Sequence, residues 1–144
     1  MRFRLASELW PLVDRAFQYH SREIRLLVPS ATVDHVGATS VPGLLTKGDL
    51  DLLVRVPPEE LETAEAALRL RYPGLVDGTE AELPVGIEVV AEGSPRAQRV
   101  LALKRAFRTR PELVEQANAL KREHEGGDPA AYEAAKQAFY STFA

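Results

Sequence analysis

Hydrophobic residues recur at helical spacing near the start of the chain and at strand spacing further along it. Between Leu9 and Leu27, apolar side chains return every three or four positions, which predicts an amphipathic helix that ends before Pro29. Residues 31–36 are rich in β-branched side chains and lead into Gly37, a pattern typical of a short strand. The chain is therefore expected to begin with a helix followed by a strand.

The clearest strand of the sequence covers residues 49–56. Polar and apolar residues alternate at its start and then become mainly apolar, as in a buried central strand. It follows a loop, residues 37–48, in which three glycines and a proline leave room for one helical turn. Two prolines then open a helix, and its inward side is predicted at Leu61, Ala64, Leu68 and Arg71. Residues 85–90 predict a third strand.

The remainder of the chain is predicted to form three helices. Ser94 caps the first, Thr109 and Glu112 form a capping box for the second, and Asp128 caps the third. This order predicts an α+β (mixed α/β) fold with a small mixed β-sheet of three to five strands. Helices flank the sheet and continue at the C-terminus, and we expect one domain over residues 1–144.

Composition narrows the class of protein without indicating a reaction. Apolar residues make up 45% of the chain and charged residues 27%, which is ordinary for a globular protein. The absence of cysteine excludes a disulfide scaffold and a cysteine nucleophile, and it fits a reducing compartment, so we expect a cytoplasmic protein. No apolar run approaches the roughly 20 residues needed to cross a bilayer. A net charge of −3 argues against long nucleic acid as the main partner.

Two carboxylates share one face of the strand predicted at residues 49–56. Side chains two positions apart point the same way, so Asp49 and Asp51 project together while the leucines beside Asp51 enter the core. Glu88 occupies a matching polar position in the strand predicted at residues 85–90. Three carboxylates on adjacent strands can hold a pair of Mg²⁺ or Mn²⁺ ions. The same alternation is also typical of any half-exposed strand, which leaves a purely structural role open.

A turn of glycine and hydroxyl residues precedes these acids by about a dozen positions. Gly37 permits a close backbone approach, and Thr39 and Ser40 add hydroxyl groups. Successive backbone N–H groups in such a turn can hold phosphate. The turn is a weak signal by itself, but its position before an Asp-x-Asp strand and a third acid is far more specific.

These motifs resemble those of a known superfamily. Gly-Ala-Thr-Ser from Gly37, followed by Asp-Leu-Asp from Asp49, is similar to the signature of the DNA polymerase β-like nucleotidyltransferases. More narrowly, His-Val-Gly-Ala-Thr-Ser-Val-Pro-Gly-Leu from His35, together with Lys47 and Asp-Leu-Leu-Val from Asp51, resembles the GrpB-like family within that superfamily. The resemblance runs from about residue 33 onward, and it implies a nucleotidyltransferase-like fold and a nucleoside triphosphate as ligand.

The sequence also departs from the family pattern. Ala38 replaces a serine that would add a hydroxyl beside phosphate, and Gly48 replaces a proline. Many GrpB-like sequences lack the first carboxylate and carry a His-x-His strand in place of the third. Asp49 and Glu88 stand at those positions here, which makes this chain more similar to the catalytic pattern of the superfamily.

Basic residues near these motifs are candidates for binding phosphate. Lys47 directly precedes the acids and could neutralise a phosphate, although a solvent-exposed loop lysine is an equal interpretation. Arg105 and Arg108 fall on one face of a predicted helix and could meet a triphosphate. A solvated helix face is the more common explanation for such a pair.

The sequence thus supports two hypotheses of different classes. The first is a nucleotidyltransferase that transfers a nucleoside monophosphate from a triphosphate to an unknown hydroxyl acceptor, with Asp49, Asp51 and Glu88 as metal ligands and catalytic residues. Gly37, Thr39 and Ser40 then hold phosphates. The second is a nucleotide-binding or partner-binding module with little or no catalysis. The short chain leaves little room for a separate acceptor domain, which also suggests a homo-oligomer.

Overall fold

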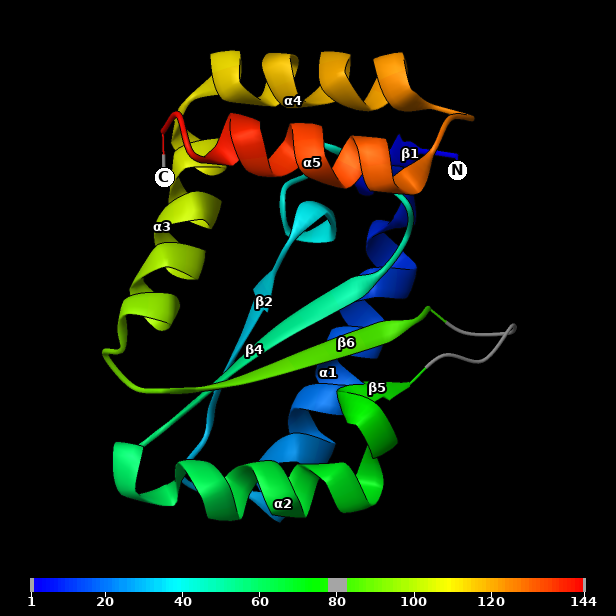
Figure 1. The fold of residues 1–144 in the computed structure, drawn as a ribbon. Helices are drawn as coiled ribbons and strands as arrows, with labels where there is room; N and C mark the ends of the chain where they lie inside the picture. Colours follow the sequence, from blue (N-terminus) through cyan, green and yellow to red (C-terminus); the bar gives the residue numbers. More distant parts are fainter. Residues whose placement is uncertain (1, 78–82, 144) are drawn as a thin grey trace.

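A four-stranded mixed sheet occupies the middle of the computed structural model, which describes residues 2–77 and 83–143 (Figure 1). Its strands, in spatial order, are β2 (Thr32–Val36), β4 (Leu50–Val56), β6 (Val85–Ala91) and β5 (Val76–Asp77). β4 pairs antiparallel with β2 and parallel with β6, and β5 pairs antiparallel with β6. A separate two-stranded antiparallel ribbon joins β1 (Arg4–Leu5) to β3 (Leu45–Thr46).

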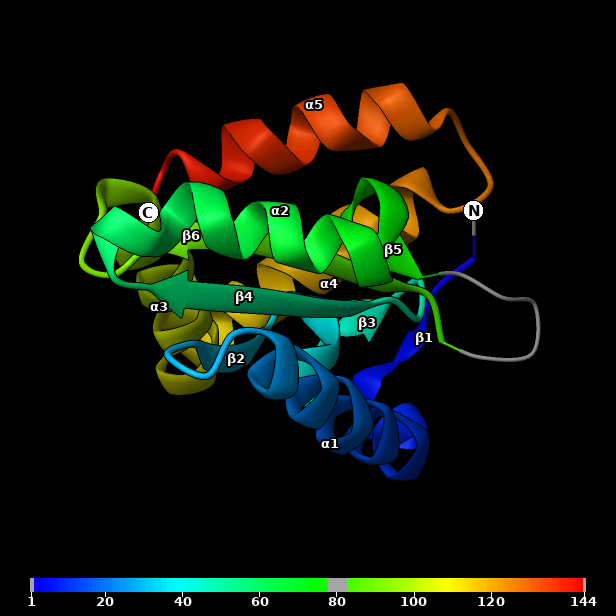
Figure 2. The same ribbon diagram turned by 90° about the horizontal axis from the view of Figure 1, so that it is seen from below.

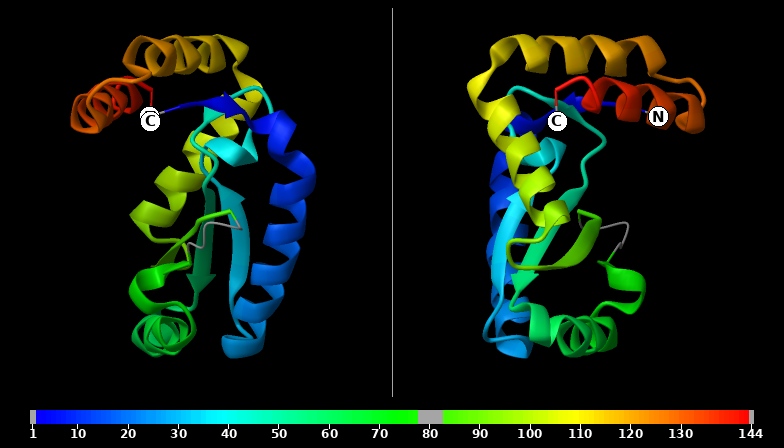
Figure 3. Two further views of the ribbon diagram at one scale, coloured as in Figure 1. Left: turned by 90° about the vertical axis from the view of Figure 1, so that its right-hand side faces the viewer. Right: turned by 60° about the vertical axis from the view of Figure 1, so that its left-hand side comes forward.

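The described residues form five α-helices around the sheet. They are α1 (Trp10–Leu27), α2 (Leu61–Arg71), α3 (Pro95–Thr109), α4 (Pro111–His124) and α5 (Pro129–Tyr140). Figure 2 views the molecule from the end at which α2 lies. Figure 3 shows α1 and α3 on opposite sides of the strands and the α4–α5 pair crossing one end of the sheet. Within the described ranges, no helix is both long enough and apolar enough to cross a membrane.

Alternation along β4 sends its side chains to two different packing environments. Leu50, Leu52, Val54 and Val56 are essentially inaccessible to solvent and pack against apolar side chains of α1 and α2. On the other face, Leu53 packs with Val90 of β6 and with α3. Asp51 shares that second face, because it is two residues before Leu53. The main core therefore lies under α1 and α2, and the acids face the side of α3.

A second apolar cluster lies away from the sheet. It joins the end of α3 to α4 and α5 and to the loop before β3, and its buried members are Val41, Leu44, Phe107, Leu113 and Ala117. The aromatic rings of Phe107 and Phe143 meet edge to face, with their centroids 5.5 Å apart. The C-terminal helices are thus held together by a cluster separate from the core beneath the sheet.

The sequence-based fold class is confirmed, and most element bounds agree within a residue or two. The helix caps at Ser94 and Asp128 are also confirmed, because each side chain accepts a backbone N–H of the first helical turn. The capping box at Thr109 is wrong: Thr109 is the last residue of α3, and its hydroxyl donates to the carbonyl of Arg105 instead. The strand predicted from Asp49 begins at Leu50, and β1, β3 and β5 were not expected.

Candidate functional site

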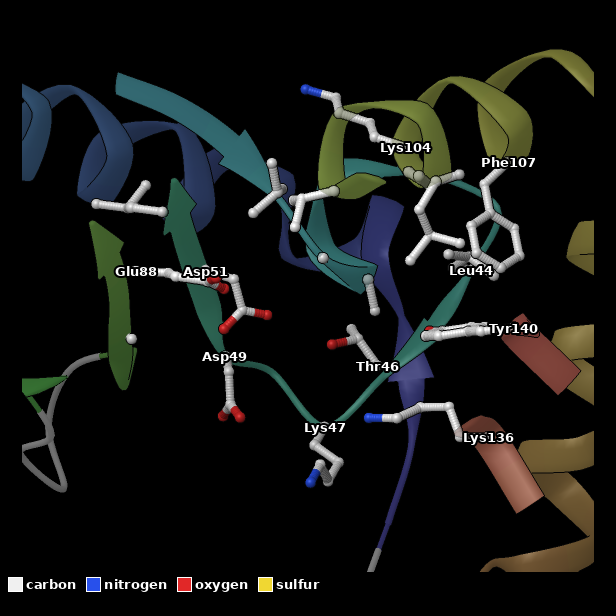
Figure 4. A pocket seen from close by; sticks show the side chains of 18 of the residues that line it. Leu44, Thr46, Lys47, Asp49, Asp51, Glu88, Lys104, Phe107, Lys136 and Tyr140 are labelled. Carbon is white, nitrogen blue, oxygen red and sulfur yellow. The ribbon is translucent and has the colours of Figure 1, made fainter. Parts of the chain in front are cut away.

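Asp49, Asp51 and Glu88 all project from the same face of the β4–β6 pair (Figure 4). Asp51 lies opposite Gly86, and Glu88 lies opposite Leu53, so the two acids are displaced by two residues along neighbouring parallel strands. Asp49 precedes the first residue of β4. Strand alternation predicts that the three carboxylates share one face of the sheet. The register between β4 and β6 places Asp51 and Glu88 on that face.

Two glycines make the space that the Asp51 carboxylate fills. A Cβ atom at Gly37 would lie 2.3 Å from Asp51 Oδ2, and a Cβ atom at Gly86 would lie 3.3 Å from Oδ1. Gly37 also has a φ of +76°, in the left-handed region that side chains rarely adopt. The backbone at Gly37, just after the end of β2, therefore encloses the Asp51 carboxylate on that side.

This enclosure changes the proton affinity of Asp51. Burial, followed by the negative charge of Asp49, raises the pKa of Asp51 to about 6 from an ordinary value of 3.8. The charges of Lys136 and Lys47 act in the opposite direction without reversing the shift. Carboxylate oxygens are the ligands that Mg²⁺ or Mn²⁺ prefers, so the neighbouring side chains of Asp49 and Asp51 fit one divalent cation.

Glu88 is not available as a metal ligand in this arrangement. Its two carboxylate oxygens accept hydrogen bonds of 2.6 and 3.0 Å from Nε and Nη2 of Arg96, at the start of α3. Across residues 2–77 and 83–143, no group of three acidic, histidine or cysteine side chains is placed to hold a metal ion. A complete triad requires Glu88 to leave Arg96, an exposed pair that contributes at most about 1 kcal/mol.

The predicted phosphate-binding hydroxyls point inward. Thr39 is fully buried, and its Oγ1 donates to the carbonyl of Asp49 at 2.9 Å. Because that hydroxyl proton is already committed, His35 Nε2 donates to Thr39 Oγ1, at 2.8 Å. Ser40 is 1% exposed and donates to the carbonyl of Gly37 at 2.6 Å. In contrast to the expectation from sequence, both hydroxyls shape the loop, and neither faces the cleft.

A cleft of about 590 Å³ opens between the acidic face of the sheet and the C-terminal helices. The three acids line one wall, together with Gly37 and Gly86. The cationic side chains of the lining are Lys47, Arg96, Arg99, Lys104, Lys121 and Lys136, and Glu133 beside Lys136 is a fourth acid. Aliphatic side chains and the rings of Phe3, Phe107, Tyr132 and Tyr140 also line the cleft. The cleft is thus acidic on the side of the sheet and basic on the side of the helices.

Three lysines influence one another within this cleft. Lys121 on α4 is 6% exposed, and its Nζ donates to the carbonyl of Leu45. Burial and then the charges of Lys136 and Lys47 lower the pKa of Lys121 to about 8. Lys136 on α5 also pairs with Glu133 at 2.8 Å. Positive charges gathered in a partly buried space favour the binding of an anion such as phosphate.

The two arginines expected to bind phosphate lie elsewhere. Neither Arg105 nor Arg108 lines the cleft. Arg108 Nη1 donates to the carbonyl of Ser40 at 3.2 Å, and Arg105 is exposed on the surface of α3. Their place in the cleft is taken by Lys121 and Lys136, which sequence reasoning did not select as site residues. Helical spacing placed these lysines on their helices but could not show which helix faces the acids.

The comparisons with solved structures show a nucleotidyltransferase-like fold. The chain matches the crystal structure of GrpB from Enterococcus faecalis with a TM-score of 0.63 and 19% identity, over 92% of this chain and 95% of that one. It also matches the MgGTP-bound Cid1 poly(U) polymerase with a TM-score of 0.60 and 11% identity. That match covers 82% of this chain and 42% of the polymerase.

The chain belongs to the GrpB protein family, whose pattern matches residues 7–144. A relative from Vibrio cholerae, described as a UPF0157 protein, is 33% identical in an alignment 151 residues long that covers 96% of this chain and 79% of that protein. Membership in the family agrees with the resemblance drawn from the His35 and Asp51 motifs.

Proposed function

We propose that this protein is a metal-dependent nucleotidyltransferase that binds a nucleoside triphosphate across the cleft. The observation that carries the proposal is the opposition of charge: Asp49 and Asp51 lie on the side of the sheet, and Lys121 and Lys136 lie on helices at the other side of the cleft, with Lys47 in the loop just before the acids (Figure 4). A bound nucleotide would place its metal ion at the acids and its outer phosphates at the lysines, so that opposite charges meet on both sides of the cleft. The likeness of the fold to MgGTP-bound Cid1 supports the same class of ligand.

In the proposed reaction, the oxygen of an acceptor hydroxyl forms a bond to the α-phosphorus. The bond from that phosphorus to the oxygen bridging to the β-phosphorus breaks, and pyrophosphate leaves. Asp49 and Asp51 would hold a divalent cation, which would supply charge neutralisation when bound. Glu88 would complete the site and accept the acceptor's proton once it separates from Arg96. The lysines hold the departing phosphates.

The loop residues have a supporting part in this scheme. Gly37 allows the backbone to enclose Asp51, and Thr39 fixes the carbonyl of Asp49, so the two carboxylates stay adjacent. Ser40 closes the turn by bonding the carbonyl of Gly37. We assign the phosphate contacts to lysines rather than to Arg105 and Arg108, because those arginines do not line the cleft.

Calorimetric binding of ATP, GTP, CTP and UTP with Mg²⁺ tests the proposal. Asp51→Asn is expected to abolish the metal-dependent binding, and Lys136→Gln is expected to weaken it at least about tenfold. Glu115→Gln and Arg122→Gln are matched controls on exposed positions of α4 outside the cleft. Binding that is unchanged in both cleft variants, or equal with and without metal, would contradict the proposal.

A second candidate is a nucleotide-binding module that does not transfer nucleotides. The ion pair between Glu88 and Arg96 favours it, because it keeps both oxygens of the third acid from a metal ion in the cleft. This candidate predicts metal-dependent nucleotide binding without release of pyrophosphate for any hydroxyl acceptor. Release of pyrophosphate that stops in Glu88→Gln, with binding retained, would decide in favour of the transferase.

A further inference from the structure

A second hollow of about 350 Å³ lies behind the cleft, between α1 and α3 and beside the edge strand β2. Trp10 and Phe17 of α1 form one wall, and Lys104 and Arg108 of α3 form the other. Its lining shares only Lys104 with the lining of the cleft. Figure 4 shows the ammonium end of Lys104 pointing away from the three acids. The hollow is therefore a separate space that shares Lys104 alone with the lining of the cleft.

The two cations of this hollow are held in place by backbone carbonyls. Lys104 Nζ donates to the carbonyl of His35 at 2.6 Å, and Arg108 Nη1 donates to the carbonyl of Ser40 at 3.2 Å. Within residues 2–77 and 83–143, neither side chain forms an ion pair with a carboxylate. Each carbonyl occupies one donor, so further N–H groups of both side chains are left for a ligand.

The acidic side chains that line the hollow form no ion pair with these cations. Asp34 lines the floor but is engaged by Arg55, whose Nε lies 2.7 Å from Asp34 Oδ2. Asp14 on α1 is the remaining acid of the lining. Burial, then the charges of Lys104 and Arg108, lowers the pKa of His35 to about 4, so its ring stays neutral at pH 7. Because Arg55 also pairs with Glu92, the formal charges around the hollow balance, and its positive charge is concentrated on the α3 wall, where Lys104 and Arg108 contact carbonyls rather than carboxylates.

The opposite wall is aromatic and partly open. The ring of Trp10 is stacked on His35 with the centroids 6.2 Å apart and the planes 28° apart, and Phe17 lies against the same imidazole at 5.8 Å. Trp10 nevertheless remains 43% exposed. Part of its indole is therefore available to a second flat group, and such stacking is favourable for aromatic ligands.

We infer that this hollow is a binding site for a small aromatic acid, with the ring of the ligand against Trp10 and its phosphate or carboxylate at Lys104 and Arg108. The volume is in the range of small-molecule pockets. The inference does not depend on the proposed nucleotide site, because the two linings differ in everything except Lys104.

The chain's one tryptophan makes the test direct, since Trp10 lies at the rim of the hollow. Titration with phenyl phosphate, without Mg²⁺, is expected to change Trp10 fluorescence saturably. Benzoate is the second probe and distinguishes a phosphate from a carboxylate ligand. Arg108→Gln is expected to weaken binding by about tenfold or more. Arg105→Gln on the same helix is the matched control and is expected to bind as the wild type does.

Asp14→Asn provides a second variant that acts in the opposite direction. It removes the remaining carboxylate from the wall, so it is expected to tighten binding of phenyl phosphate by several fold. Asp51→Asn is expected to leave the titration unchanged, which separates the hollow from the cleft. Three results would overturn the inference. The first is the absence of a saturable fluorescence change with either probe, and the second is an affinity for inorganic phosphate equal to that for phenyl phosphate. The third is a fluorescence change that is lost in Asp51→Asn but kept in Arg108→Gln.

Discussion

At the scale of single residues, the Asp51 carboxylate is defined by the atoms that surround it. Gly37 and Gly86 approach its two oxygens from β2 and β6, and Asp49 brings a second negative charge from the start of β4. When such an enclosed carboxylate is ionised, it lowers the stability of the native state. A bound cation offsets this loss of stability. The titration of Asp51 and its contact with Gly37 give two predictions.

Asp51→Asn is expected to raise the free energy of unfolding by about 2 kcal/mol at pH 7.5. The pKa of Asp51 is about 6 in the folded protein and 3.8 ordinarily, so the native state gains stability from protonation as the pH falls from above 6 toward 4. The advantage of the variant should therefore shrink by pH 4.5. Urea unfolding at both pH values measures it, and an equal advantage at each pH would contradict the assigned titration.

Gly37→Ala tests the enclosure of Asp51 against a matched control. Gly37 and Gly93 both have a positive φ, of +76° and +75°, but a Cβ atom at Gly93 meets nothing within 4 Å. Both variants carry the strain of a positive φ, whereas only Gly37→Ala displaces the carboxylate. We expect Gly37→Ala to lose at least about 1 kcal/mol more stability than Gly93→Ala and to lose metal binding. Equal melting temperatures for the two variants would contradict this.

At the scale of elements, the pairing of α3 with β6 controls the third acid. Arg96→Gln removes the partner of Glu88 and is expected to tighten binding of Mg²⁺ while changing stability by less than about 1 kcal/mol. Arg69→Gln, which breaks the exposed pair with Glu65 on α2, is the control for loss of a surface ion pair. Calorimetry with Mg²⁺ measures the effect. Unchanged affinity in Arg96→Gln would remove Glu88 from the metal site.

Local patterns predicted the elements better than they predicted the cleft. Alternation around Asp49 and Asp51 gave the correct face of the strand, because strand geometry depends on neighbouring residues alone. The caps at Ser94 and Asp128 are local in the same way. Lys121 and Lys136 were missed because their approach to the acids depends on how α4 and α5 cross the sheet. The inward turn of Thr39 depends on Asp49, ten residues away.

At the scale of the whole molecule, the two walls of the cleft belong to separately packed clusters. The acids lie on a sheet supported by α1 and α2, whereas Lys121 and Lys136 lie on helices packed around Phe107 and Leu113. A destabilising substitution in one cluster should therefore affect ligand binding differently from a substitution in the other cluster.

Leu68→Ala and Leu113→Ala compare the two clusters. Both side chains are buried, at 0% and 3% exposure, and each truncation is expected to cost about 2–5 kcal/mol. Leu113→Ala should also weaken nucleotide binding by the remaining folded protein, because it loosens the helices that carry the lysines. Leu68→Ala should lower stability with a smaller effect on affinity. Urea unfolding and calorimetry provide the comparison, and equal losses of affinity would contradict it.

The enclosure of Asp51 has a practical consequence for finding ligands. Gly37, Asp51 and Gly86 meet only when β2, β4 and β6 have assembled, since they are far apart in the sequence. A ligand of this site therefore binds the native state and not the unfolded chain. Binding of that kind raises the melting temperature with ligand concentration. A thermal-shift screen of metal ions, nucleotides and hydroxyl compounds in combination would identify the acceptor as the compound that adds a further shift to that of the metal–nucleotide pair.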